Sequence, residues 1–579
     1  MNQPTPAIVA QSAVRRLPRL ALLLLCAAYL MPGLIGRGPW KSADISAYGY
    51  MAELAQSGQG LLRWLDPLLL GLRPETPALL PYWIGAWAIK AAPAWISPDL
   101  AVRFAYALML WLTFTATWYA AYYLARTSQA QPVAFAFGGE ARPKDYARAI
   151  ADGALLALIA CLGLAQLGHE TTPALAQLFF SSQLFYGISA LPYRRKGPLV
   201  AILVGLAGTA LSGAPAVALL LGFFAMLFVS SDRRRSTGSA SSEDSTYPLF
   251  ALSAMIVATA LTGLLAAQLG LWHWKIDLPG TSASKSLASD LRSQAKLLLW
   301  FTWPAWPLAV WTLWRWRRQL GARHVAVPLL FALVPLAATW TTAFSERSLL
   351  LALPALATLA AFALPTFRRS VSALIDWFTL LFFSGSAAII WGYWIAMQTG
   401  YPPKMAASVT RLVPGFIPSV SWLALVFALA ATLAWCWLVR WRTGRHRAAL
   451  WKTLVLPAGG AALCWLLGTT LWLPALDYAL SYAPQVHAIA QRVGQPSCIS
   501  TVALTRPQIA ALRYHAQFNL KPLDVSVPLC PWIVAGPDAI GSLHQIVNLE
   551  GWRFDGTLRR PTSASDDLLL FQRVAPSGG

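Results

Sequence analysis

The 579-residue chain has few charged side chains and very few acidic ones. Only 12% of its residues are charged and only 23 are Asp or Glu, whereas 57% are hydrophobic. A soluble domain carries about 25% charged residues, so a soluble globular protein is disfavoured. Apolar runs of bilayer-spanning length recur along the whole chain. The composition therefore predicts an all-α, polytopic membrane protein.

The chain also lacks the motifs of several function classes. It has no phosphate-binding glycine loop, Walker motif or Rossmann fingerprint, which argues against a nucleotide sugar or ATP as direct substrate. No charged residue with a partner stands in mid-span and no inverted repeat is evident, although both are expected of an ion-coupled transporter. The six cysteines have no zinc-type spacing.

The excess positive charge of +22 lies in short basic clusters between apolar runs. Such clusters mark cytoplasmic loops, so they predict membrane topology and no nucleic-acid partner. The apolar stretch 78–97 is assigned to a surface helix, because a crossing there would turn every later cluster outward. We therefore expect a cytoplasmic N-terminus and about thirteen spans in a transmembrane domain, 1–478, with a first outer loop at 37–99. The expected spans are 20–36, 100–124, 150–168, 173–191, 198–212, 214–230, 248–271, 297–318, 325–343, 348–366, 373–397, 414–438 and 450–475.

Residues 479–579 are expected to form a small outer α/β domain. CISTVAL, PLDV, CPWIVAG and DLLLFQRV read as strands, and PQIAALRYHAQFNL reads as a helix. Cys498 and Cys530 flank two of these strands in an oxidising compartment. They either form a disulfide or remain two buried thiols.

The first outer loop carries four of the few acidic residues, Asp44, Glu53, Asp66 and Glu75. Asp44 lies in SADISAYGYMAELAQSG, which reads as a helix along the membrane surface. It is either a catalytic carboxylate or a helix cap. Glu53 is about half a turn out of phase with Asp44, which argues against a two-carboxylate hydrolase.

Glycosyl transfer needs only one carboxylate to take the acceptor proton, and cations for the leaving phosphate. Arg347, in Ser345-Glu346-Arg347 at an outer turn, is the best such cation, although single arginines at span ends also anchor headgroups. His169-Glu170 closes another outer turn. This pair either binds a metal, binds a sugar hydroxyl or caps the following helix with Thr171 or Thr172. The other outer cations are Lys41, Arg63, Arg73, Lys275, Lys285, Lys404 and Arg411.

The order of these segments resembles the family 39 glycosyltransferases, which include protein O-mannosyltransferases and lipid A aminoarabinose transferases. The likeness is carried by the Asp44 helix ending in ELAQSG, then PALLPYWIGAWAIK, DLAVRFAYALMLWLTFTATWYAAYYLAR and SERSLLLALPALATLAAF. It implies a GT-C fold in which Asp44 is the base. It further implies that Arg347 meets the donor phosphate with Glu346 beside it, and that Tyr48, Tyr82, His169 and Glu170 line the substrate site.

Two departures from the family pattern alter this expectation. The family's Asp-Glu pair is Asp44-Ile45 here, and its Lys-Pro-Pro reads Thr76-Pro77-Ala78. The missing lysine removes a phosphate ligand, so another cation must serve, and Arg73 or Lys41 is nearest in sequence.

The resemblance implies an inverting transfer of a sugar from a polyprenyl-phosphate donor to a periplasmic acceptor, namely lipid A, a glycan or a protein. It places the protein among the lipids of a bacterial inner membrane, with its C-terminal domain in the periplasm. No cofactor is required by this chemistry, and a divalent metal ion stays open. The alternatives are a lipid-linked sugar flippase or transporter, and a polymerase or ligase that uses a lipid diphosphate donor.

Overall fold

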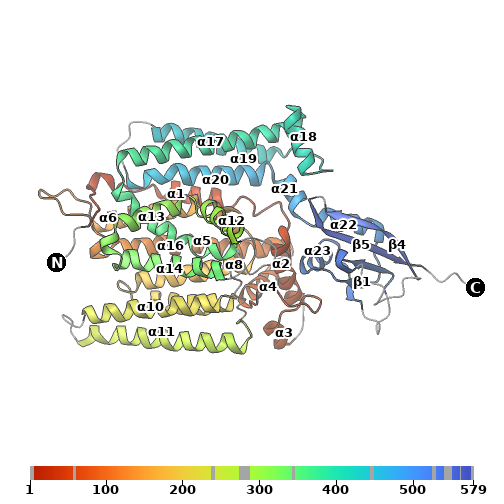
Figure 1. Ribbon diagram of the computed structural model, residues 1–579, viewed down its shortest axis with the longest axis horizontal. Coiled ribbons are helices and arrows are strands. Elements are labelled where there is room, and N and C mark those ends of the chain that lie inside the picture. The colour runs from red at the N-terminus through yellow and green to blue at the C-terminus, as the bar shows by residue number, and fades with distance from the viewer. Residues whose placement is uncertain are drawn as a thin grey trace, which may run out of the picture.

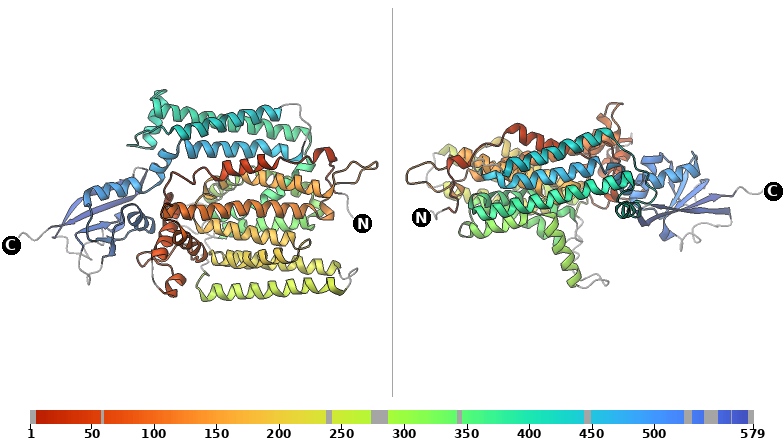
Figure 2. Two further views of the ribbon diagram at one scale, coloured as in Figure 1. Left: turned by 180° about the vertical axis from the view of Figure 1, so that it is seen from behind. Right: turned by 90° about the horizontal axis from the view of Figure 1, so that it is seen from above.

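The computed structural model is a long bundle of helices with a mixed α/β unit at one end (Figure 1). It describes residues 5–56, 60–236, 242–272, 287–341, 346–443, 449–523, 530–539, 551–560 and 562–574. The chain starts at one end of the bundle and finishes in the α/β unit beyond the other end, and the two further views agree (Figure 2).

Most helices of the bundle are apolar and run roughly along its long axis (Figure 1), whereas α12 projects away from it (Figure 2). Several expected spans are interrupted: 150–168 is divided between α6 and α7, 297–318 between α12 and α13, and 348–366 between α15 and α16. Pro304 stands at the α12–α13 break, where a residue without an N–H cannot continue the helix. The helices are α1 (Arg19–Leu30), α5 (Pro98–Ala125), α6 (Pro143–Ala160), α7 (Leu162–Leu167), α8 (Pro173–Ala190), α9 (Lys196–Leu211), α10 (Pro215–Ser236), α11 (Ser242–Gln268), α12 (Leu287–Phe301), α13 (Ala305–Arg315), α14 (Arg323–Thr341), α15 (Glu346–Leu350), α16 (Leu353–Ala363), α17 (Arg369–Thr399), α18 (Pro403–Leu412), α19 (Trp422–Thr443), α20 (Val455–Thr470) and α21 (Leu473–Leu480).

Five stretches of the described helices are long and apolar enough to cross a membrane. They are Pro98–Ala125, Leu249–Gln268, Arg369–Thr399, Trp422–Thr443 and Leu450–Thr470, and five shorter apolar helices accompany them. The stretches in α17 and α19 bury little of their surface inside the protein, which suits helices that face lipid. The chain is thus a polytopic membrane protein, and the count of thirteen spans stays a prediction.

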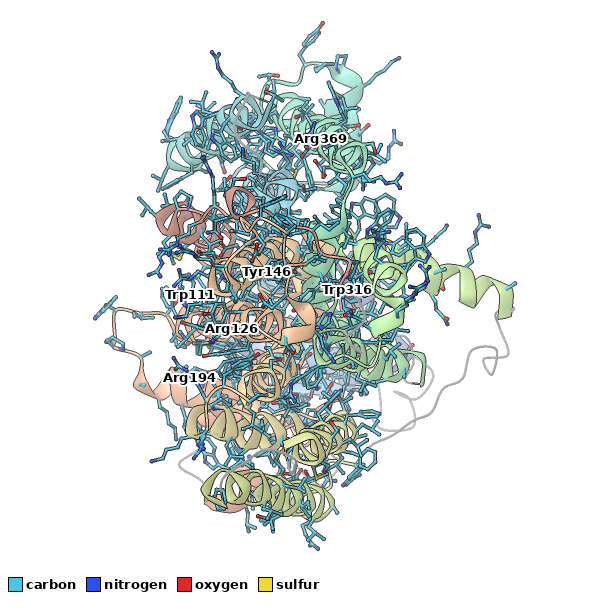
Figure 3. The ribbon with its side chains drawn as sticks, turned by 90° about the vertical axis from the view of Figure 1, so that its left-hand side faces the viewer. Trp111, Arg126, Tyr146, Arg194, Trp316 and Arg369 are labelled. Atoms are coloured by element: carbon cyan, nitrogen blue, oxygen red, sulfur yellow. A yellow bond between two sulfur atoms is a disulfide. The ribbon has the colours of Figure 1, made fainter. Side chains whose placement is uncertain are left out.

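Three of the predicted basic clusters lie at the end of the bundle where the chain starts. Arg126, Arg194 and Arg369 all lie at this end (Figure 3). They follow α5, follow α8 and open α17, respectively. The opposite end carries the α/β unit (Figure 1).

Three helices of the first loop lie between the bundle and the α/β unit (Figure 1). They are α2 (Lys41–Gln56), α3 (Leu61–Leu65) and α4 (Leu80–Ala91). Within the stretch 78–97 a helix forms as α4, which is 12 residues long and too short to span a bilayer. Its place on the membrane surface stays a prediction. Trp64 and Trp87 stack with ring centroids 6.2 Å apart, and this packing joins α3 to α4.

The α/β unit holds a five-stranded sheet in the order β2-β1-β3-β5-β4. Strand β1 pairs in parallel with β2 and β3, and β5 pairs antiparallel with β3 and β4. The strands expected at CISTVAL, CPWIVAG and DLLLFQRV form as β1, β3 and β5, and the expected helix forms as α23. The strand expected at PLDV overlaps β2 at Pro522, and its last two residues lie outside the described residues. Strand β4 was not predicted. The elements are α22 (Ala483–Val493), β1 (Ile499–Val502), α23 (Arg506–Ala516), β2 (Leu520–Pro522), β3 (Trp532–Ala535), β4 (Trp552–Arg560) and β5 (Ser563–Arg573).

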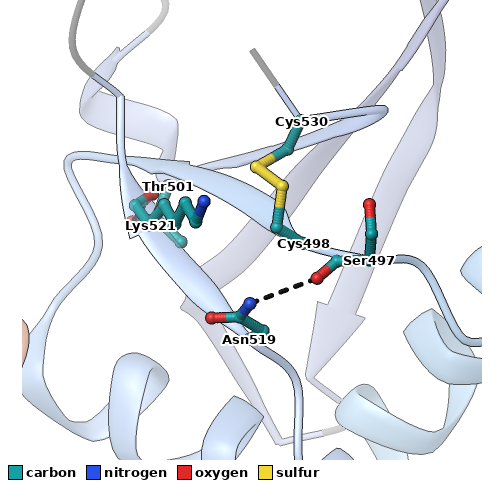
Figure 4. Close-up of a disulfide and its surroundings, with 6 residues drawn as sticks. All are labelled: Ser497, Cys498, Thr501, Asn519, Lys521 and Cys530. Carbon is teal, nitrogen blue, oxygen red and sulfur yellow. Dashed lines mark hydrogen bonds between the residues drawn. A yellow bond between two sulfur atoms is a disulfide. The ribbon is translucent and has the colours of Figure 1, made fainter. Parts of the chain in front are cut away.

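Cys498 and Cys530 are joined as a disulfide at one end of this sheet (Figure 4). The two cysteines immediately precede β1 and the turn into β3, and 32 residues separate them in sequence. The bond thus fastens two neighbouring parallel strands where they start. A crosslink of this span restricts the unfolded chain and so favours the folded unit.

Candidate active site

The carboxylate of Asp44 is buried in the first turn of α2 and accepts four hydrogen bonds. One oxygen accepts the Thr171 backbone N–H at 2.7 Å and the Thr171 hydroxyl at 2.6 Å. The other accepts the Trp40 backbone N–H at 2.8 Å and the Arg37 guanidinium at 3.2 Å. Asp44 is only 1% exposed. The carboxylate therefore joins α2 to the turn that precedes α8.

Arg37 balances the buried charge of Asp44. Its Nε donates to the Gly33 carbonyl at 2.6 Å, and its Nη2 donates to the His169 carbonyl at 2.6 Å. Burial lowers the pKa of Arg37, and the charge of Asp44 opposes that shift. Because this buried ion pair has further hydrogen bonds on both sides, it holds the first loop and the His169 turn in one arrangement.

A second ion pair, between Glu170 and Arg347, lies next to the pair of Arg37 and Asp44. Glu170 is buried, and its Oε2 lies 3.1 Å from Nη2 of Arg347 in α15. Gln166 donates to the other Glu170 oxygen at 3.2 Å. Since Glu170 precedes Thr171, the contacts of Asp44 and Arg347 meet at this turn. The structure thus brings together three residues that sequence analysis selected separately.

His169 is half-buried at the same turn. Its Nδ1 faces the Ala165 carbonyl at 2.6 Å and its Nε2 faces the Tyr29 carbonyl at 3.0 Å. Burial lowers the pKa of His169 to about 4, although the two carbonyl oxygens oppose the shift. The Thr172 side chain makes no capping bond to α8. Helix capping by Thr172 is therefore wrong, since Glu170 forms an ion pair with Arg347 and Thr171 hydrogen-bonds to Asp44, contacts that none of the three expected roles of this turn includes.

A cavity of about 920 Å³ lies beside this network. It is bounded by α2, the segment before α4, the turn between α9 and α10, α14, α15 and the start of α23. Among the described residues that line it, three carry charge: Glu75, Arg347 and Arg506. Tyr82 also lines it and approaches the Thr76 carbonyl at 3.4 Å. Two arginines, one carboxylate and a mainly apolar wall suit an anionic ligand with an apolar part.

Asp44 is not among the described residues that line this cavity. Residues on either side of it, Ala43 and Ser46, do line the cavity, so the start of α2 forms its wall while the carboxylate points into the Arg37–Thr171 network. Glu75 is the one carboxylate among the described lining residues, and sequence analysis gave it no role.

Other predicted site residues lie elsewhere. Arg73 is 74% exposed and pairs with Asp66 at 2.9 Å, outside the described cavity lining. Tyr48 packs edge-on against Tyr514 of α23 with ring centroids 5.0 Å apart, and burial raises its pKa. Lys41 and Glu346 begin α2 and α15, but their side chains lie outside the described part of the structure.

The described residues contain no group of three or more His, Cys, Asp or Glu side chains that could hold a metal ion. His169 and Glu170 are adjacent in sequence, yet each is engaged with a different partner. A metal at this turn therefore has no support in the described geometry.

Sequence reasoning missed Arg37 and Arg506. Arg37 had a signal, since it follows the first apolar run and stands seven residues before Asp44. Arg506 had none, because its side chain reaches the cavity from a different domain.

The fold is similar to that of a solved membrane protein. Two crystal structures of ArnT from Cupriavidus metallidurans, one bound to undecaprenyl phosphate and one in the apo state, align with TM-scores of 0.57 and 0.55. Each alignment covers 97% of this chain and 98% of ArnT at 16% sequence identity. The chain has the ArnT fold. The expected fold is thereby confirmed over almost the whole chain, with both the bundle and the terminal α/β unit inside the aligned region. No family model and no curated protein sequence matches the chain.

Proposed function

We propose that this protein transfers a sugar from a polyprenyl-phosphate donor to an acceptor on the side of the membrane that carries the α/β unit. The observation that supports it is the cavity of about 920 Å³ with Arg347 and Arg506 in its wall, in a chain with the ArnT fold. ArnT itself has been crystallised bound to undecaprenyl phosphate, a lipid with one phosphate and a long apolar tail.

The proposed reaction is an inverting displacement. A hydroxyl oxygen of the acceptor bonds to the anomeric carbon, and a carboxylate takes the hydroxyl proton. The bond between the anomeric carbon and the phosphate oxygen breaks, and the polyprenyl phosphate leaves with that electron pair. Its charge rises as it leaves, so arginines in an apolar wall stabilise the transition state more than the ground state.

Asp44 is the proposed base. To act, it must exchange one of its four hydrogen bonds for the acceptor hydroxyl, because both oxygens have partners and the carboxylate is buried. Glu75 is the competing candidate, since it already faces the cavity.

The acceptor is proposed to be lipid A, a glycan or a protein in the periplasm, and the bilayer the bacterial inner membrane. The end of the bundle that carries Arg126, Arg194 and Arg369 would then face the cytoplasm, because cytoplasmic loops are rich in arginine and lysine. The disulfide between Cys498 and Cys530 agrees with an oxidising compartment on the other side.

The test is mass spectrometry of lipid A, envelope glycans and envelope proteins from wild-type, deletion, Asp44→Asn and Glu75→Gln cells. Asp66→Asn is the matched control, because Asp66 lies in the same loop, pairs only with exposed Arg73 among the contacts described for it, and is outside the cavity lining. Each variant is scored per amount of folded protein in the membrane. We expect the sugar to be lost on deletion and in Asp44→Asn, and kept in Asp66→Asn.

Other outcomes point elsewhere. Loss in Glu75→Gln with normal transfer in Asp44→Asn moves the base to Glu75. Loss only on deletion, with both variants active, favours a flippase or transporter of lipid-linked sugar. An unchanged envelope in the deletion strain contradicts the proposed function.

A further inference from the structure

Arg506 carries a charge from the α/β unit into a cavity otherwise formed by the bundle and its first loop. It is the first residue of α23, and it lines the cavity together with Arg347 of α15. Its Nε donates to the Arg73 carbonyl at 2.6 Å, a contact between residues 433 apart in sequence. That bond fixes the side chain against the segment before α4.

The remaining contacts of Arg506 are ones that a ligand can replace. Its Nη1 lies 3.5 Å from Glu75, a long contact to a side chain that is 78% exposed. An exposed ion pair of this length contributes little to stability. Tyr50 also lines the cavity near Arg506. Burial raises the pKa of Tyr50 to about 12, and the charge of Arg506 opposes that shift.

Each arginine of the cavity wall has a carboxylate partner, but the two partners differ in burial. Glu170, which pairs with Arg347, is buried, whereas Glu75, which pairs with Arg506, is 78% exposed. An incoming anion therefore displaces Glu75 from Arg506 more readily than it displaces Glu170 from Arg347. The segment 74–77 beside Arg506 lines the cavity with Glu75 but with no cation. Arg506 therefore supplies positive charge to the part of the wall where this sequence lacks the lysine of the family pattern.

We propose that Arg506 binds a phosphate group of a substrate held in the cavity, so that the α/β unit completes the site. This inference rests on the proposed function. The planar guanidinium presents donors that match phosphate oxygens, and the bond to the Arg73 carbonyl orients it beforehand. The phosphate belongs either to the polyprenyl donor or to a phosphorylated acceptor lipid, and the two sources are separable by experiment.

The experiment measures binding by native mass spectrometry of the full-length chain in detergent. The probes are undecaprenyl phosphate and, separately, lipid A. The variants are Arg506→Gln, Arg506→Lys and Arg513→Gln. Arg513 is the matched control, because it lies on the same helix, pairs with Glu53 of α2 and is not among the described cavity-lining residues.

We expect Arg506→Gln to weaken the binding of one probe by about tenfold or more, as loss of a charge-assisted hydrogen bond does. Arg506→Lys should recover part of that loss, and Arg513→Gln should bind like wild type. Weakened undecaprenyl phosphate binding assigns the phosphate to the donor, and weakened lipid A binding assigns it to the acceptor.

Equal losses in Arg506→Gln and Arg513→Gln would overturn the inference, because Arg506 would then act only by holding the α/β unit in place. Wild-type affinity of Arg506→Gln for both probes would also overturn it, while leaving the proposed function intact. Failure of the wild-type chain to bind either lipid would reject both proposals together.

Discussion

Thr171 donates both its backbone N–H and its hydroxyl to one oxygen of Asp44, at 2.7 and 2.6 Å, across 127 residues of sequence. The contact joins the first surface helix to the turn before α8, and that turn also holds Arg347 through Glu170. The turn His169–Thr171 thus positions both the candidate base, Asp44, and the candidate phosphate ligand, Arg347. A change at this turn should therefore affect both residues.

Replacement Thr171→Val tests that connection. Valine keeps the branched shape and the backbone N–H but removes the hydroxyl, which lies 2.6 Å from a buried carboxylate oxygen. Hydrogen bonds to charged groups contribute about 1.5–3 kcal/mol, so the unfolding free energy should fall by that amount. Chemical denaturation in detergent measures it. Thr171→Ser, which restores the hydroxyl, should recover most of the loss, and equal stability of the Val and Ser variants would contradict the role of this bond.

Removal of Arg37 should have a larger effect. Arg37→Gln leaves the Asp44 charge buried without its ion-pair partner and removes the donor to the His169 carbonyl. Breaking a buried pair in this way costs about 3–5 kcal/mol. The same denaturation assay measures the loss. Arg63→Gln is the control, because Arg63 is 42% exposed and lies 3.9 Å from Glu53, where a pair contributes at most about 1 kcal/mol. Similar losses in the two variants would show that burial of the Arg37 pair is unimportant.

The contact between α2 and α23 depends on a glycine. A Cβ at Gly49 would lie 2.7 Å from the Ala510 Cβ of α23, closer than two carbon atoms can pack. Gly49→Val should therefore separate the α/β unit from α2, although glycine in a helix interior is otherwise unfavourable. We expect faster proteolysis of the chain near α21 and α22 and a loss of cavity binding, measured on the purified protein. Gly60→Ala has no neighbour within 4 Å and should change neither. Unchanged proteolysis of Gly49→Val would mean that the two helices are not in this contact in solution.

The sequence predicted the fold better than the contacts of the site. Apolar runs and basic clusters are local features, so the helical bundle and the short helix α4 could be inferred from them, whereas the fold family was implied only by the order of segments that resembles a known family. Asp44, Glu170 and Arg347 were each selected as polar residues of outer loops, but their shared turn depends on how α2, α8 and α15 pack. The order of segments in the sequence does not predict how these three helices pack.

Three failures have distinct physical causes. Arg73 is nearest in sequence to the missing lysine, yet it turns outward to Asp66, and Arg506 reaches the cavity from 433 residues away. Arg37 has the sequence context of an exposed arginine beside a span. In the structure it is buried and forms an ion pair with Asp44. Strand β4 alternates weakly and carries several charged residues, so its pattern did not distinguish it from a loop.

The stability of the folded protein should fall as the pH falls, because His515 of the α/β unit is held uncharged. Burial lowers the pKa of His515 in α23 from 6.5 to about 4, helped by nearby His487 and opposed by Asp99. The folded state therefore binds fewer protons than the unfolded state between these values, so stability is full above about pH 6.5 and declines towards pH 4. We expect the thermal unfolding midpoint of the purified protein to drop between pH 7 and pH 5. His515→Gln should flatten this dependence, whereas His487→Gln, at an exposed position, should retain most of it. An identical pH dependence in wild type and His515→Gln would show that His515 stays solvated and that the α/β unit does not bury it.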